Sequence, residues 1–132
     1  MYLERVELTN VRRFGHLGWQ LDADTPRAGW HVILGDNGSG KTTFLRAVTL
    51  ALIGAWEAPA TRVNARNFIL NDRDRAEIEL RLSADPAWDR RVDGQDAIPQ
   101  AGIARCLVMR QMSGRGSSYT SPKDKDDDAI TS

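Results

Sequence analysis

The sequence predicts an α/β fold in which a mixed sheet surrounds one helix and an antiparallel sheet lies to the side. Three observations carry this prediction. Apolar and polar residues alternate with a strand-like period over 2–9, 17–21 and 76–82. A mostly apolar segment over 41–53 tolerates helix throughout, and a glycine-rich loop precedes it. At 132 residues, the chain has the length of about one domain.

The N-terminal segment predicts an antiparallel pair of strands. Val6 and Leu8 share one face of the first strand, and Leu17, Trp19 and Leu21 alternate with polar or small residues in the second. The sequence between the two strands, NVRRFGH, is short enough for a hairpin connection. We therefore expect a hairpin at the start of the fold.

A buried strand followed by a helix is predicted in the middle of the chain. Residues 30–34, WHVIL, form a short apolar run bounded by glycines, which is typical of a strand covered on both faces. The helical segment 41–53 leaves almost no polar face, and Gly54 supplies a stop. We therefore expect this helix to be deeply packed.

The later part of the chain carries weaker signals. AEIELRL at 76–82 alternates strictly and predicts a half-buried strand, and ARCLVMRQM is consistent with one more. The segment from 113 onward is low in apolar residues, so we expect it to be disordered. The predicted organisation is a lobe over 1–82, a partly structured extension over 83–112 and a disordered tail over 113–132.

Composition excludes several classes of protein. The 18 basic and 18 acidic side chains cancel, so no overall field attracts the chain to nucleic acid or an acidic membrane. One cysteine, Cys106, excludes an internal disulfide and fits a reducing compartment. No apolar stretch approaches the roughly 18 residues that span a bilayer. We therefore predict a cytoplasmic protein with no membrane partner.

The glycine-rich loop carries the clearest chemistry. Residues 35–42, GDNGSGKT, match G-x-x-x-x-G-K-[ST], the phosphate-binding loop. Glycines allow successive backbone N–H groups to point inward and form a concave anion site, to which the following helix adds the positive end of its dipole. The alternative, a chance match, is disfavoured because an apolar run precedes the loop and a helix follows it.

Two side chains complete this predicted site. Lys41 can reach the β- and γ-phosphates of a nucleotide, and Thr42 offers a hydroxyl to the accompanying Mg²⁺. The loop residues that we expect to bind the nucleotide are Gly35, Asp36, Asn37, Gly38, Ser39, Gly40, Lys41, Thr42 and Thr43.

Longer segments resemble one branch of the P-loop ATPases. GDNGSGKTT, with Asn37 two residues after Gly35, resembles the G-x-N-G-x-G-K-[ST]-[ST] form of ABC-type ATPases. The upstream LERVELTNVRRFGHLGWQLD resembles the opening of SMC/RecF-like proteins, in which N-F-[RK]-x-F separates two strands; Val11 replaces the usual Phe. The resemblance covers about residues 1–82 and identifies the chain as the N-terminal lobe of an SMC/RecF-like AAA-family ATPase.

This resemblance implies a P-loop NTPase fold, ATP and Mg²⁺ as cofactors, and Arg12 as a nucleotide ligand. A solvated hairpin arginine is the alternative for Arg12 and the favoured interpretation of Arg13. Phe14 is assigned to the core in preference to base stacking. The implied process is DNA repair, recombination or anti-phage defence, with DNA as a partner of the full assembly.

The residues for hydrolysis are not recognisable in this chain. It contains neither an apolar strand ending in Asp-Glu nor an L-S-G-G signature, which the resemblance places in a C-terminal lobe. Catalytic residues therefore remain unassigned, and we expect a C-terminal ATPase lobe or a second copy as partner. The alternative function is a non-catalytic ATP-sensing or assembly module; a small-molecule kinase is disfavoured because about thirty residues precede the loop.

Overall fold

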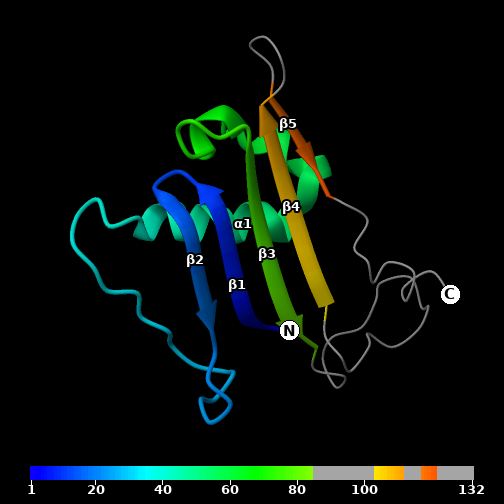
Figure 1. The fold of residues 1–132 in the computed structure, drawn as a ribbon. Coiled ribbons are helices and arrows are strands. Elements are labelled where there is room, and N and C mark those ends of the chain that lie inside the picture. Colours follow the sequence, from blue (N-terminus) through cyan, green and yellow to red (C-terminus); the bar gives the residue numbers. More distant parts are fainter. Residues whose placement is uncertain (85–102, 112–116, 122–132) are drawn as a thin grey trace, which may run out of the picture.

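The computed structural model describes residues 1–84, 103–111 and 117–121, which form one five-stranded sheet with a helix against one face (Figure 1). The strands are β1 (Tyr2–Val11), β2 (Phe14–Gln20), β3 (Arg75–Ser83), β4 (Ile103–Gln111) and β5 (Ser117–Thr120). Their order in the sheet is β2-β1-β3-β4-β5, and every neighbouring pair is antiparallel. The predicted mixed sheet is therefore wrong for the described residues, whose sheet contains no parallel pair.

The opening hairpin is confirmed. β1 and β2 pair in the register Val6↔Trp19 and Leu8↔Leu17, and the pair Val11↔Phe14 leaves a turn of two residues. Arg12 in this turn has a φ of 50°, in the left-handed region. The turn also bonds to a distant segment, because the Arg12 N–H donates to the Phe68 carbonyl at 2.8 Å. The hairpin turn is therefore held both by the pairing of β1 with β2 and by its hydrogen bond to Phe68.

β3 confirms the strand predicted from alternation. Its inward side chains Ala76, Ile78, Leu80 and Leu82 are buried, while those between them lie on the other face. Side chains of β1, such as Val6 and Leu8, and of β4, such as Leu107 and Met109, complete the core on the same side of the sheet. The sheet thus buries one face, as its period of two requires.

The helix α1 (Lys41–Glu57) crosses the strands on the buried face of the sheet, behind it in Figure 1. Its buried residues are Thr43, Ala47, Leu50 and Ala51, which follow one stripe of the helix. Gly54 has a φ of 80° and interrupts the helical backbone, in agreement with the predicted stop. Two short 3-10 helices follow, η1 (Ala58–Thr61) and η2 (Ala65–Phe68).

Two predictions about this region are wrong. Residues 30–34 form no strand, and Trp30 and Leu34 are 99% and 86% exposed. The helix is not deeply packed on all sides, because Leu45, Leu52 and Ile53 are exposed on the face turned away from the sheet. The physical reason is common to both errors: the described residues provide no second layer to pair with 30–34 or to cover that face.

β5 lies within the segment predicted to be disordered. Ser117–Thr120 pairs with the edge of β4, and the Tyr119 hydroxyl donates a hydrogen bond to the Val63 carbonyl. A few polar residues can form a strand when an existing edge offers backbone partners, so the disorder prediction does not hold for these four residues. Residues 85–102, 112–116 and 122–132 lie outside the described residues.

None of the helices in the described part of the chain has the length and apolar character needed to cross a bilayer.

Candidate phosphate-binding site

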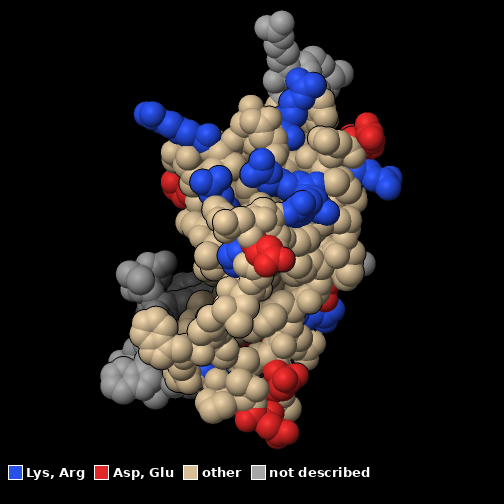
Figure 2. All heavy atoms as spheres, turned by 90° about the vertical axis from the view of Figure 1, so that its left-hand side faces the viewer, with Lys and Arg blue, Asp and Glu red and all other residues tan. Residues whose placement is uncertain are grey.

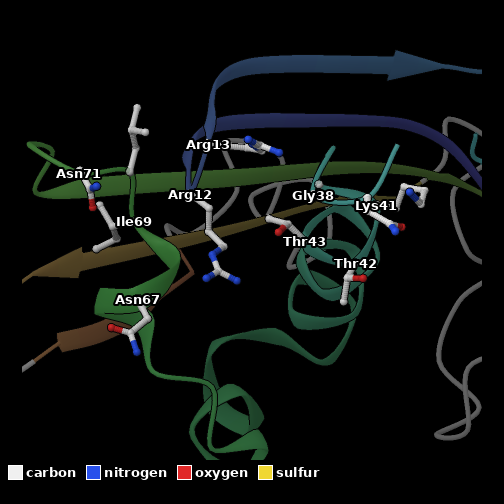
Figure 3. A pocket seen from close by; sticks show the side chains of 12 residues that line it. Arg12, Arg13, Gly38, Lys41, Thr42, Thr43, Asn67, Ile69 and Asn71 are labelled. Atoms are coloured by element: carbon white, nitrogen blue, oxygen red, sulfur yellow. The ribbon is translucent and has the colours of Figure 1, made fainter. Parts of the chain in front are cut away.

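A pocket of about 670 Å³ lies where the hairpin turn, the start of α1 and the segment 67–71 meet (Figure 3). The glycine loop contributes Asn37, Gly38 and Gly40, and the first turn of α1 contributes Lys41, Thr42 and Thr43. The structure therefore brings Arg12 together with six of the nine predicted loop residues around one cavity.

The backbone at the start of α1 is shaped by glycines. Gly38 and Gly40 have φ values of 82° and 106°, which side-chain-bearing residues rarely adopt. Gly40 occupies the N-cap position, and no side chain caps the helix there. The first N–H groups of α1 consequently have no partner within the helix, which makes this end suited to an anion.

Lys41 is folded back over the loop that precedes it. Its Nζ donates to the carbonyl oxygens of Gly35 at 2.5 Å and Asp36 at 2.8 Å. These contacts hold the ammonium group beside the first turn of α1. Because its partners are neutral carbonyls, its positive charge is not cancelled by a carboxylate among the described residues.

The two threonines differ in their surroundings. Thr42 is exposed and its hydroxyl is accessible at the pocket wall, whereas Thr43 is buried against the sheet. Thr42 is therefore the better placed of the two to donate its oxygen to a cation.

Both arginines of the hairpin turn line the pocket. Arg12 extends into the space between η2 and the start of α1 (Figure 3). Arg13 lies nearer the loop, since a β-carbon on Gly38 would be 3.7 Å from one of its terminal nitrogens. Arg13, which the sequence favoured as solvated, thus joins the same wall. Neither arginine forms an ion pair in the described part of the chain.

The charge around the pocket has one sign. Three cationic side chains line it, and none of its described lining residues is acidic. On the face shown in Figure 2, Lys and Arg side chains gather in the upper half. The zero net charge of the chain therefore conceals a local positive field.

Not every predicted loop residue faces this pocket. Gly35, Asp36 and Ser39 are absent from its wall. Ser39 instead lines a second, more apolar groove of about 720 Å³, which runs between β2, α1 and residues 30–34. Phe14, predicted to belong to the core, packs against the core cluster and also borders this second groove.

Sequence reasoning missed one wall of the pocket. Asn67, Ile69, Leu70 and Asn71 line it, although no motif marks them. Only the backbone contacts between this segment and the hairpin turn bring them to the site, and no signal in the sequence indicates those contacts.

Two comparisons concern the sequence of the chain. A family model described as an AAA domain matches residues 5–107. An OLD nuclease of Thermus scotoductus is 35% identical over 86 residues, which are 65% of this chain and 15% of that relative. This chain therefore corresponds to a small part of the length of the curated relative that it matches.

A solved structure gives a further comparison. It comes from work on the ATP-driven dimerization and DNA-stimulated activation of SMC ATPases, and it matches 92% of this chain and 69% of its own length. The TM-score is 0.59 and the sequence identity is 21%, so the likeness concerns the fold.

Proposed function

This chain belongs to the AAA domain family, and from that premise we propose that it binds ATP together with Mg²⁺ in the pocket described above. Its described residues form an N-terminal ATPase lobe of the SMC/RecF-like type. The observation that carries the proposal is the meeting of three cationic side chains and an uncapped helix N-terminus around a pocket whose described lining includes no acid.

Each part of the pocket has a role in this proposal. The N–H groups at the start of α1 bind phosphate oxygens, and Lys41 exchanges its loop carbonyl partners for the β- and γ-phosphates. Arg12 binds the phosphates from the opposite wall. In the phosphate contacts both partners are ionised, whereas the carbonyl partners of Lys41 are neutral, so the phosphates can take the place of these carbonyls.

Magnesium fits the same place through Thr42. Its exposed hydroxyl would be one oxygen ligand, and the nucleotide phosphates and water would supply others, as Mg²⁺ commonly requires. The ion would neutralise phosphate charge and orient the phosphates.

Hydrolysis requires more than these residues provide. A carboxylate normally helps to hold Mg²⁺ and another group positions the attacking water, but the described lining of the pocket is free of acidic residues. We therefore assign nucleotide binding to this lobe and place turnover in a complex with a C-terminal ATPase lobe or a second copy. The same observation favours the second candidate function, a non-catalytic ATP-sensing or assembly module.

An exposed apolar surface supports the need for a partner lobe. Trp30 and Leu34 precede the glycine loop and line one groove with Leu45 of α1. Farther along the helix, Leu52 and Trp56 are also exposed, Trp56 to 91%. Side chains of this size are rarely left together in water without a partner. We propose that a C-terminal ATPase lobe covers this surface. The full assembly would serve DNA repair, recombination or anti-phage defence, with DNA as a further partner.

Calorimetric titration with ATP and Mg²⁺ tests the function, with phosphate release followed in parallel. We expect the chain to bind, Lys41→Ala to lose binding, and neither to release phosphate at a measurable rate. Arg46→Ala, which changes an exposed arginine of α1 outside the pocket, is the control and should bind like the unmodified chain. Binding that survives in Lys41→Ala would overturn the proposed site, and Lys41-dependent turnover would overturn the assignment to binding alone.

A further inference from the structure

The outer edge of β2 is an open edge of the sheet. β2 (Phe14–Gln20) is the first strand in the order β2-β1-β3-β4-β5, so only β1 pairs with it (Figure 1). Within the described chain, no backbone group of β2 forms a hydrogen bond to a segment other than β1. A strand with such an edge is a template on which another strand can pair.

The pairing with β1 determines which backbone groups this edge presents. The N–H of Leu21, which directly follows β2, donates to the Glu4 carbonyl at 2.8 Å. In an antiparallel pair, residues that bond to one neighbour alternate with residues that bond to the other side. The register between β1 and β2 is unbroken from Gln20 to His16. The N–H and C=O groups of His16, Gly18 and Gln20 therefore point toward the open edge.

β2 carries none of the features by which proteins usually protect an edge. Protected edge strands are very short, charged, interrupted by proline or bent by a bulge. β2 has seven residues with the sequence FGHLGWQ, which contains no Lys, Arg, Asp, Glu or Pro. At the other edge of the described sheet, β5 has only four residues. The edge of β2 is therefore the one that favours a further strand.

The sequence of β2 fits an antiparallel copy of itself. Leu17 is the central residue of the strand, so a two-fold axis at Leu17 pairs two copies over their whole length. In this register Trp19 lies opposite Gly15, and His16 lies opposite Gly18, so each glycine faces an aromatic ring. A β-carbon on Gly15 would have nothing within 4 Å, which leaves space for such a ring. Aromatic residues that cover edge glycines help to fix the register of a strand pair.

We propose that two copies of this chain pair along β2, in the register centred on Leu17, to form one continuous antiparallel sheet. A second copy is the partner that this edge fits, because β2 is self-complementary and its lack of charge avoids repulsion between like strands. The open groups of His16 in one copy then meet those of Gly18 in the other. No residue of β2 lines the phosphate pocket, so the pairing needs no nucleotide and goes beyond the proposed function.

Sedimentation equilibrium of the full chain without nucleotide, from about 1 to 200 µM, tests the pairing. We expect a reversible monomer–dimer equilibrium in the micromolar range, because one strand pair buries less surface than a standard interface. His16→Pro removes an N–H that points to the open edge and should weaken the dimer at least about tenfold. His16→Ala is the matched control. It removes the same ring but keeps the N–H, so it should weaken the dimer less than about threefold.

Urea denaturation checks that His16→Pro folds, and a cross-link tests the register independently of that variant. Leu17→Cys is made together with Cys106→Ser, so that it is the only cysteine of the chain. Because the two copies of residue 17 face each other as a pair without mutual hydrogen bonds, their β-carbons lie close enough for a disulfide. Mild oxidation should yield a covalent dimer. Thr9→Cys in the same background lies on β1, one strand away from the edge, and should yield little.

The remaining outcomes overturn the pairing. A chain that stays monomeric over the whole concentration range, or that dimerises only when ATP is added, has no partner at this edge. Equal weakening by His16→Pro and His16→Ala would exclude the backbone of β2 from the contact. Equal cross-linking through Leu17→Cys and Thr9→Cys would place the contact on another surface. All these results leave the proposed nucleotide binding untouched, because none of the variants changes a residue of the phosphate pocket.

Discussion

The ring of Phe14 lies directly against Gly40, so that a β-carbon added at residue 40 would be 2.9 Å from Cε2 of that ring. Phe14 is the first residue of β2, and Gly40 immediately precedes α1. The contact therefore joins the hairpin to the glycine loop. It permits only a hydrogen atom at this position of the loop.

Gly40→Ala should impair both folding and nucleotide binding. The added methyl group meets the Phe14 ring, and the φ of 106° at this position is strained for alanine. We expect the free energy of unfolding to fall by roughly 2 kcal/mol and ATP affinity to fall more than tenfold. Urea denaturation and calorimetry measure the two effects. Gly15→Ala is the matched control, because a β-carbon there has nothing within 4 Å; equal effects from both substitutions would contradict the packing argument.

Arg12→Ala should weaken ATP binding without unfolding the chain. Arg12 is exposed and lines the pocket, so its removal costs charge-assisted hydrogen bonds to phosphate. Such bonds contribute about 1.5–3 kcal/mol, which corresponds to a roughly tenfold to hundredfold loss of affinity. Arg12→Lys should restore part of it, since lysine keeps the charge but loses the planar fork. If Arg12→Ala binds ATP as tightly as the unmodified chain at low ionic strength, Arg12 is a solvated turn residue and not a nucleotide ligand.

Two leucines of α1 should respond differently to truncation. Leu50 is 2% exposed and faces the sheet, whereas Leu52 is 47% exposed on the uncovered side. Leu50→Ala should lower the free energy of unfolding by about 3 kcal/mol, because it leaves a cavity in the core. Leu52→Ala should cost less than about 1 kcal/mol. Urea denaturation of the isolated chain measures both, and similar losses would mean that the far side of α1 is already covered.

Tyr119→Phe should destabilise the packing of β5 by about 1 kcal/mol, because it removes the hydrogen bond that the phenol donates to the Val63 carbonyl. Burial raises the pKa of Tyr119 above its ordinary value. The neutral phenol is thus favoured in the folded state. The contribution of the neutral phenol to the free energy of unfolding is complete below about pH 10, the ordinary pKa of tyrosine. It is lost as the pH rises through the raised pKa of the folded state. The difference in unfolding free energy between the chain and Tyr119→Phe should therefore shrink above pH 10; a constant difference would contradict this account.

The elements that the sequence predicted correctly are those that fold through local or alternating patterns. β3 was predictable because its inward residues repeat every second position, and the hairpin because two alternating runs are separated by a short turn. The positive φ values at Gly38 and Gly40 were predictable from the glycine pattern of residues 35–42, whereas phosphate binding by this loop stays a prediction.

The remaining features depend on what other elements offer. WHVIL at 30–34 has the composition of a buried strand, but a strand needs partners that the described residues do not supply. Asn67 and Asn71 reach the pocket only because η2 bonds to the hairpin turn, a tertiary contact without a sequence signature. β5 forms by pairing with the edge of β4, and nothing in the sequence of Ser117–Thr120 indicates this partner.

The pairing of β1 with β3 has a kinetic consequence. Val6 pairs with Leu80, so the glycine loop, α1 and the segment 67–71 all belong to the connection that this pairing closes. Contacts between residues so distant along the chain give the fold a high contact order, and such pairings form slowly. The pocket itself forms only when the hairpin turn, the start of α1 and residues 67–71 come together. Under the proposed function, a nucleotide binds the finished lobe but not its precursors, so it should prolong the native lifetime without accelerating folding.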